Sequence, residues 1–251
     1  TEAGRSRKFQ ELISTVNAGC DSCAAEIPMV PDRLVLDDEI SKNPEKFRMP
    51  GMIPLGMEYD TVSFSCMDIG RTGSLAILGD AEISVRLTKT ILRILASNII
   101  FHDVEAIVID NRQKSLESVN RYGFVKNYTS DPAEALEFLS EFYDGLRERK
   151  NAAHPEELST VMLVWNQPEL FRKICADKNA AGELSAALKQ ADSTKAFLLL
   201  PQMENAAVGF NASEVLKTLK ELRHGVLCAS VTENRFYEIS GRVRADSDFD
   251  R

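Results

Sequence analysis

The chain has 251 residues, of which 44% are hydrophobic and 27% charged, so it can bury a sizeable core and is neither disordered nor collagen-like. This length fits one large domain, or a domain with an appended arm, better than two full domains. Thirty basic and 38 acidic residues give a net charge of −8, which disfavours a nucleic acid partner.

The cysteines and the apolar runs exclude two further classes of protein. Five cysteines at irregular spacing do not form a disulfide framework in so long a chain, which indicates a reducing cytosol. Apolar runs such as Ala196–Leu200 fall far short of the roughly 20 residues of a membrane span. Because the chain starts at Thr1 without a Met and shows no signal peptide pattern, we interpret it as a fragment of a longer protein.

One cysteine pair, Cys20 and Cys23, has the spacing of half a zinc site. No second pair accompanies it, and the three histidines stand alone in the sequence: His102, His154 and His224. We therefore expect no metal site.

The first 54 residues resemble a connecting segment more than a core. Residues 5–18 carry apolar side chains at helical spacing, which predicts an amphipathic helix. Five prolines between residues 27 and 54 predict an extended strap. We assign 1–30 to a linker arm from a preceding domain and 31–251 to the compact domain.

Strands and helices are expected to alternate along the compact domain. The short apolar runs that predict strands are Val62–Met67, Ser74–Leu78, Ala106–Ile109, Val161–Trp165, Ala196–Leu200 and Val226–Val231. One helix is expected over Pro132–Lys150, with Asp131 as its N-cap, and another from Ala212 to about His224, capped by Asn211 and stopped by Gly225. This alternation predicts an α/β fold with a mostly parallel sheet covered by helices on both faces.

The segment after the second predicted strand has the layout of a phosphate-binding P-loop, in which a strand leads through G-x-x-x-x-G-K-[ST] into a helix. The eight positions of the motif are occupied by Gly79, Asp80, Ala81, Glu82, Ile83, Ser84, Val85 and Arg86. Ser84, Val85 and Arg86 replace the second glycine, the lysine and the hydroxyl residue, so three of the four diagnostic residues are missing. We expect a helix that begins near Ser84 and occludes the phosphate site. Lys89 lies farther along this helix and either reaches back as a substitute lysine or belongs to a solvated face.

The order of these motifs resembles a known family. Ile53-Pro54-Leu55-Gly56 ahead of a strand, followed by Ser74–Asp80, is similar to the opening of FtsK/SpoIIIE-type P-loop ATPase domains. The likeness is greatest to the last tandem ATPase domain of EssC-type coupling ATPases of type VII secretion, and it extends from about residue 27 to the C-terminus. It implies a RecA/FtsK-like P-loop NTPase fold.

The resemblance also indicates which strand should carry the Walker B carboxylates. Ala106–Asp110 has the Walker B pattern by itself, but in this family the catalytic strand corresponds to Val161–Trp165. Trp165 and Asn166 then occupy the positions of the Mg²⁺-linked aspartate and the catalytic acid, and neither can act as an ionised carboxylate. Gln202 either retains the place of a polar sensor residue or belongs to a turn with Pro201.

A degenerate module is what the resemblance implies for function. We expect no catalytic residue, no resident cofactor, and at most weak binding of ATP and Mg²⁺. The expected role is recognition of small helical secreted proteins of the WXG type and coupling to active neighbouring ATPase domains, on the cytoplasmic side of the membrane. Leu170 and Phe171 could line an apolar substrate pocket, although their place in the core is the simpler interpretation.

Three questions stay open at this level. The domain could be an unconventional ATPase that uses Lys89, a DNA-translocating motor, or a module whose resemblance is limited to the fold. Family ATPases form rings, so one of four arginines could reach a neighbour's nucleotide: Arg147, Arg149, Arg235 or Arg242.

Overall fold

The computed structural model describes residues 52–58, 62–97, 104–154, 157–228 and 234–237, and the single residues Lys8, Glu11, Ser14, Thr15 and Val35. The chain divides into two compact units, Thr1–Leu34 with Met57–Phe64, and Val35–Gly56 with Ser65–Arg251. The cysteine pair Cys20 and Cys23, His102, Arg242 and most of the predicted strap lie outside the described residues, as does most of the predicted helix over 5–18.

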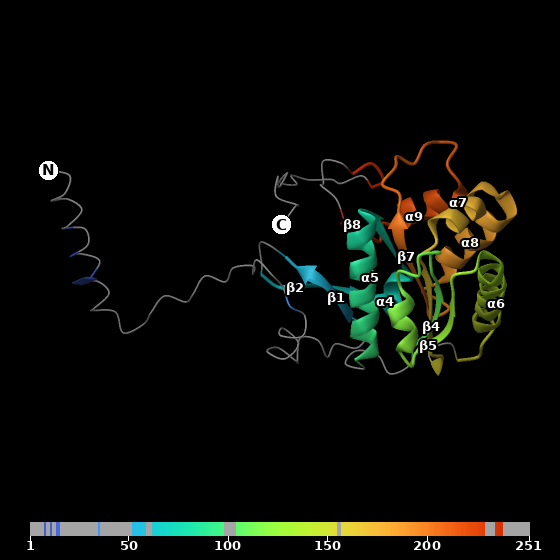
Figure 1. Cartoon of the computed structure of the whole chain (residues 1–251), viewed down its shortest axis with the longest axis horizontal. Helices are drawn as coiled ribbons and strands as arrows, with labels where there is room; N and C mark the ends of the chain where they lie inside the picture. The colour runs from blue at the N-terminus through green and yellow to red at the C-terminus, as the bar shows by residue number, and fades with distance from the viewer. Residues whose placement is uncertain are drawn as a thin grey trace. The chain divides into compact units, whose positions relative to one another are not determined.

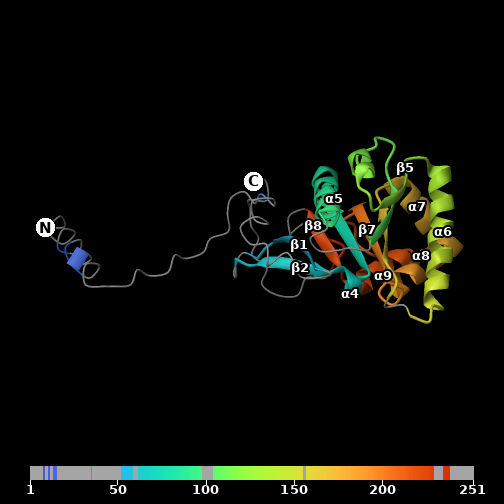
Figure 2. The ribbon, with the colours of Figure 1, turned by 90° about the horizontal axis from the view of Figure 1, so that it is seen from below.

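A six-stranded sheet forms the centre of the second unit (Figures 1 and 2). Its strands are β3 (Ser74–Gly79), β4 (Val104–Ile109), β5 (Val125–Thr129), β6 (Thr160–Trp165), β7 (Ala196–Met203) and β8 (Gly225–Cys228). They pair in the order β5-β4-β6-β7-β3-β8, and every pairing is parallel. This confirms the predicted α/β class and the parallel sheet.

Successive side chains of a strand point to opposite faces of the sheet, so the apolar strands make both faces apolar. Helices cover both faces. Leu163 and Leu198 face one core, with α6 (Pro132–Lys150), α7 (Pro168–Ala176), α8 (Lys178–Gln190) and α9 (Glu214–Leu222). Met162 and Phe197 face the other core, with α5 (Ala81–Ala96) and the 3-10 helix η1 (Glu117–Arg121). In Figure 2 the sheet lies between α5 on one side and α6 on the other.

A short hairpin precedes the sheet. Its strands β1 (Met52–Met57) and β2 (Phe64–Asp68) form a separate two-stranded sheet and lead through the one-turn helix α4 (Ile69–Thr72) into β3. The Ile53-Pro54-Leu55-Gly56 run lies within β1 and ahead of β2, which corresponds to the strand predicted at Val62–Met67. β1 and β5 were not among the predicted strands.

The predicted helix α6 has the predicted bounds, and the Asp131 carboxylate accepts a hydrogen bond from the Ala133 N–H at its start. For α9 the predicted ends are wrong. Its N-cap is Ser213 rather than Asn211, and it ends at Leu222 because Arg223 takes a left-handed conformation with φ of 58°. Gly225, the predicted stop, is the first residue of β8.

Candidate functional site

The turn between β3 and α5 occupies the place of the predicted phosphate loop. Gly79 has φ of +103°, which favours glycine, and Asp80 alone separates the strand from the helix. The Asp80 carboxylate accepts a hydrogen bond of 2.8 Å from the Ile83 N–H and so caps α5. The prediction that the helix begins near Ser84 is wrong, because this cap starts it at Ala81.

This short turn changes what the strand-to-helix junction can bind. A P-loop surrounds a phosphate with free backbone N–H groups of a long loop and of the following helix N-terminus. Here one of those N–H groups is already bonded to the Asp80 carboxylate. A carboxylate at a helix N-terminus carries the same sign of charge as a phosphate and takes the same favourable position. The junction therefore supplies its own anion.

The remaining positions of the motif lie along α5. Ser84 is fully buried, and its Oγ accepts a hydrogen bond of 2.7 Å from the Gln202 backbone N–H. Val85 is half-buried and Arg86 exposed. Lys89 lies about 13 Å along the helix axis from Asp80, at 1.5 Å per residue, which is beyond the reach of its side chain.

The two strands with Walker B character end side by side. β4 and β6 are neighbours, and Ile109 pairs with Trp165 at their carboxyl ends. Asp110 and Asn166 follow directly, both fully buried, and the Asn166 amide donates a hydrogen bond of 2.7 Å to the Asp110 carboxylate. β6 is the nearer of the two to the P-loop strand, because only β7 separates it from β3.

Both oxygens of Asp110 already accept hydrogen bonds. Oδ1 accepts from the Asn111 N–H at 2.8 Å and from Asn166, and Oδ2 accepts from the Leu116 N–H at 2.7 Å and the Tyr128 hydroxyl at 2.8 Å. Burial, together with the bond to Asp110, raises the pKa of Tyr128, so its hydroxyl remains a donor. A carboxylate so fully engaged is held by the protein and has little capacity left for a metal ion.

Gln202 links this group to α5. It has φ of 56° and lies in a β-bulge, where β7 uses one residue more than β3 between the pairs Ala76–Leu200 and Leu78–Met203. Its side-chain Nε2 donates a hydrogen bond of 2.5 Å to Asn166 Oδ1, and its backbone N–H donates to Ser84. The turn predicted for Pro201 and Gln202 is thus a bulge within the strand.

We call the set Tyr128, Asp110, Asn166, Gln202 and Ser84 the edge network. It runs without interruption across the carboxyl ends of β5, β4, β6 and β7 to the first turns of α5. The sequence predicted P-loop, Walker B and sensor positions for Ser84, Asn166 and Gln202. It did not predict a role for Tyr128 or the capping role of Asp80. The Gly-Asp pair ahead of a helical pattern was the available signal for that cap.

A cavity of about 130 Å³ adjoins the edge network, with Trp165 and Gln202 among its lining residues. Trp165 is 2% exposed, packs edge-on against Phe171 at 5.5 Å, and within the described chain its indole N–H has no hydrogen-bond partner. Leu170 and Phe171 both belong to the core, which was the simpler interpretation, and Phe171 also lines this cavity. An ion pair of 3.6 Å joins Arg172 and Glu204, which also line it.

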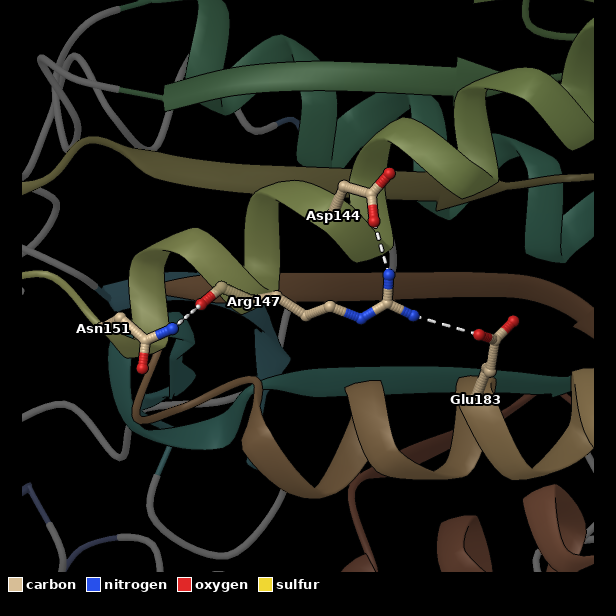
Figure 3. Close-up of polar contacts among 4 residues, drawn as sticks. All are labelled: Asp144, Arg147, Asn151 and Glu183. Atoms are coloured by element: carbon tan, nitrogen blue, oxygen red, sulfur yellow. Dashed lines mark hydrogen bonds and ion pairs between the residues drawn. The ribbon is translucent and has the colours of Figure 1, made fainter.

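The arginines predicted to act on a neighbour differ in their surroundings. Arg147 contacts Asp144 and donates a hydrogen bond of 3.0 Å to Glu183, as Figure 3 shows. Arg149 donates to the Ser159 carbonyl at 2.6 Å, and burial lowers its pKa. Both lie near the end of α6 that leads into the amino end of β6, whereas the edge network lies at the carboxyl ends of the strands. Arg235 donates to the Asn234 carbonyl at 3.2 Å.

Within the described ranges no three His, Cys, Asp or Glu side chains gather where they could hold a metal ion. None of the helices formed by those residues is both long and apolar enough to span a membrane.

Comparison with known proteins places the fold. No protein-family model matches the sequence, and no curated protein matches it either. The cytoplasmic domain of EssC superposes with a TM-score of 0.68 at 17% identity, covering 95% of this chain and 47% of that one. ATPases 2 and 3 of EssC from Geobacillus thermodenitrificans give 0.69 at 17% identity, covering 95% and 44%. ATPases 2 and 3 of Thermomonospora curvata EccC, in complex with a signal sequence peptide, give 0.63 at 17% identity, covering 92% and 42%.

The fold is therefore that of the P-loop ATPase domains. More narrowly, it is the fold of the ATPase domains of the type VII secretion proteins EssC and EccC, as the sequence motifs predicted. The chain spans less than half the length of each of these three structures.

Proposed function

We propose that this chain is an ATPase-fold module of a type VII secretion assembly that binds a secreted protein and does not hydrolyse ATP. The single observation that carries the loss of hydrolysis is the junction at Asp80. There the protein's own carboxylate takes the helix N-terminus that a phosphate requires. The edge network supports the same conclusion, since its buried carboxylate is engaged by the protein on both oxygens.

Calorimetry of the full chain with Mg-ATP tests this part of the proposal. We expect no binding heat up to millimolar ATP and no phosphate release. Micromolar binding with measurable phosphate release would overturn it and would favour the unconventional ATPase. A DNA-translocating motor would instead show salt-dependent binding to duplex DNA, which the net charge of −8 opposes.

The cavity beside Trp165 supports the binding part of the proposal. It has the size of one large aliphatic side chain, and Phe171, Met203 and Leu216 contribute apolar walls. Trp165 packs edge-on against Phe171, so the two aromatic rings form a fixed part of the cavity wall. One structure of the same fold is a complex with a signal sequence peptide. We infer that the tail of a small helical WXG-type protein inserts an apolar side chain here, and that neighbouring ATPase domains at the cytoplasmic face of the membrane supply the energy.

Binding of purified WXG-type proteins, with and without their C-terminal tails, tests this site. Ala207 is exposed and lines the cavity, so Ala207→Phe should fill its mouth without disturbing the core and weaken tail-dependent binding at least tenfold. Ala176→Phe, at an exposed position on α7 that does not line the cavity, is the matched control and should bind as the unaltered chain does. Binding that does not depend on the tail would contradict this site.

A further inference from the structure

A second and larger hollow, of about 650 Å³, lies along α9 and the edge strand β8. The hollow shares no lining residue with the cavity beside Trp165. We call it the α9 groove, and the residues that carry the argument are Phe210, Lys217, Lys220, Arg223 and Tyr237.

The wall formed by Tyr237 is fixed by its neighbours. A side chain on Gly225 would meet the Tyr237 ring at 2.4 Å, so the glycine gives the ring the space to pack against β8. The Tyr237 hydroxyl donates to the His224 carbonyl at 3.3 Å, and Asn234 Oδ1 accepts from the backbone N–H groups of Phe236 and Tyr237 at 3.2 Å. The groove is thus formed before any partner binds.

The charge of the α9 groove is opposite to that of the whole chain. Among its described lining residues are three cations, Lys217, Lys220 and Arg223, and one acidic residue, Glu221, whereas the chain as a whole carries −8. Phe210 stands at the groove with 93% of its surface exposed, and the Lys217 ammonium lies 5.5 Å from the centre of its ring. The contact with Lys217 is a favourable cation–π pair, and it places an exposed aromatic ring beside the cations of the groove.

We propose that the α9 groove binds an extended acidic peptide segment of a partner protein, with an aromatic side chain stacked on Phe210. The carboxylates of such a segment complement the three cations, and its aromatic ring gains the contact that Phe210 offers. A short acidic segment can keep its charges within the groove, whereas a continuous phosphate backbone would extend beyond the groove over a chain of net charge −8, so a peptide fits better than a nucleic acid strand. This inference does not depend on the cavity beside Trp165.

The test uses the full chain and a fluorescein-labelled peptide in which aspartates flank a central phenylalanine. Fluorescence anisotropy should show saturable binding that weakens at least tenfold between 50 and 300 mM salt. Lys217→Glu should weaken it at least tenfold. Arg223→Asn, which keeps a residue tolerant of positive φ, should weaken it about fivefold. A peptide with alanine in place of the phenylalanine should bind the unaltered chain more weakly than the phenylalanine peptide does. The two peptides should bind the Phe210→Ala variant with equal affinity.

Two controls decide the outcome. Lys178→Glu reverses an exposed charge on α8 outside the groove and should leave the affinity unchanged. An unaltered urea midpoint confirms that each variant is folded. The proposal is overturned if the peptide does not bind, if Lys178→Glu weakens binding as much as Lys217→Glu, or if a single-stranded oligonucleotide of equal charge binds more tightly.

Discussion

Asn166 shows how a single amide defines this site. It donates to a buried carboxylate, Asp110, and accepts from Gln202, so it needs both a donor and an acceptor at once. An aspartate, the residue type of the Walker B strand, would offer acceptors only and would place a second negative charge beside Asp110. The amide is therefore matched to the network rather than to metal chemistry.

Asn166→Asp should consequently lower the free energy of unfolding by about 3 kcal/mol or more at neutral pH. The like-charged pair raises the carboxyl pKa in the folded state, so the stability is lost as pH rises and recovers as one carboxyl is protonated. Urea unfolding at pH 7 and pH 5 measures this. Asn166→Ala, which adds no charge, should show a loss with little pH dependence, and a pH-independent loss for Asn166→Asp would contradict the prediction.

Ser84 makes the second residue-scale prediction. Its hydroxyl is the acceptor for the Gln202 N–H, which lies in a bulge at positive φ. Ser84→Ala leaves this donor without its partner and should cost about 1 to 3 kcal/mol in urea unfolding. Thr90→Ala is the control, because the Thr90 hydroxyl bonds only within its own helix at an exposed position. Equal costs for the two variants would show that the link to β7 is not stabilising.

At the scale of elements, α5 and α6 begin in the same way, with an aspartate cap on the first turn. Asp80→Ala and Asp131→Ala should each cost about 1 kcal/mol of stability, measured by urea unfolding. Calorimetry of the Asp80→Ala variant then separates two explanations for the closed junction. If the short turn itself prevents phosphate binding, the variant still binds no Mg-ATP. If the carboxylate alone is responsible, binding appears.

The whole molecule should be sensitive to alkaline pH. Burial raises the pKa of three of the four tyrosines that the structure describes, Tyr128, Tyr143 and Tyr237, the last to about 12. A group with a raised folded-state pKa contributes stability that is present below its unfolded pKa, near 10, and is lost as pH rises toward the folded value. The urea concentration at the unfolding midpoint should therefore decrease as the pH is raised from 9.5 to 11.5. Tyr128→Phe should lessen this dependence, and a midpoint constant over this range would refute the prediction.

The sequence by itself determined the α/β class, five of the six strands of the central sheet and the helix over 132–150, because apolar runs and caps act locally. Together with the resemblance to FtsK/SpoIIIE-type domains, it also predicted that Val85, Trp165 and Asn166 stand where the P-loop and Walker B motifs have diagnostic residues.

Only the tertiary structure decided what the residues around those positions contact. Asp110, Asn166 and Gln202 lie far apart in the chain and meet because parallel strands end at one edge of the sheet. The α9 groove likewise depends on contacts between α9, β8 and Tyr237 that no local pattern encodes. Hydrogen bonds and charges act through space, so the chemistry of this edge becomes visible only once the strands are placed side by side.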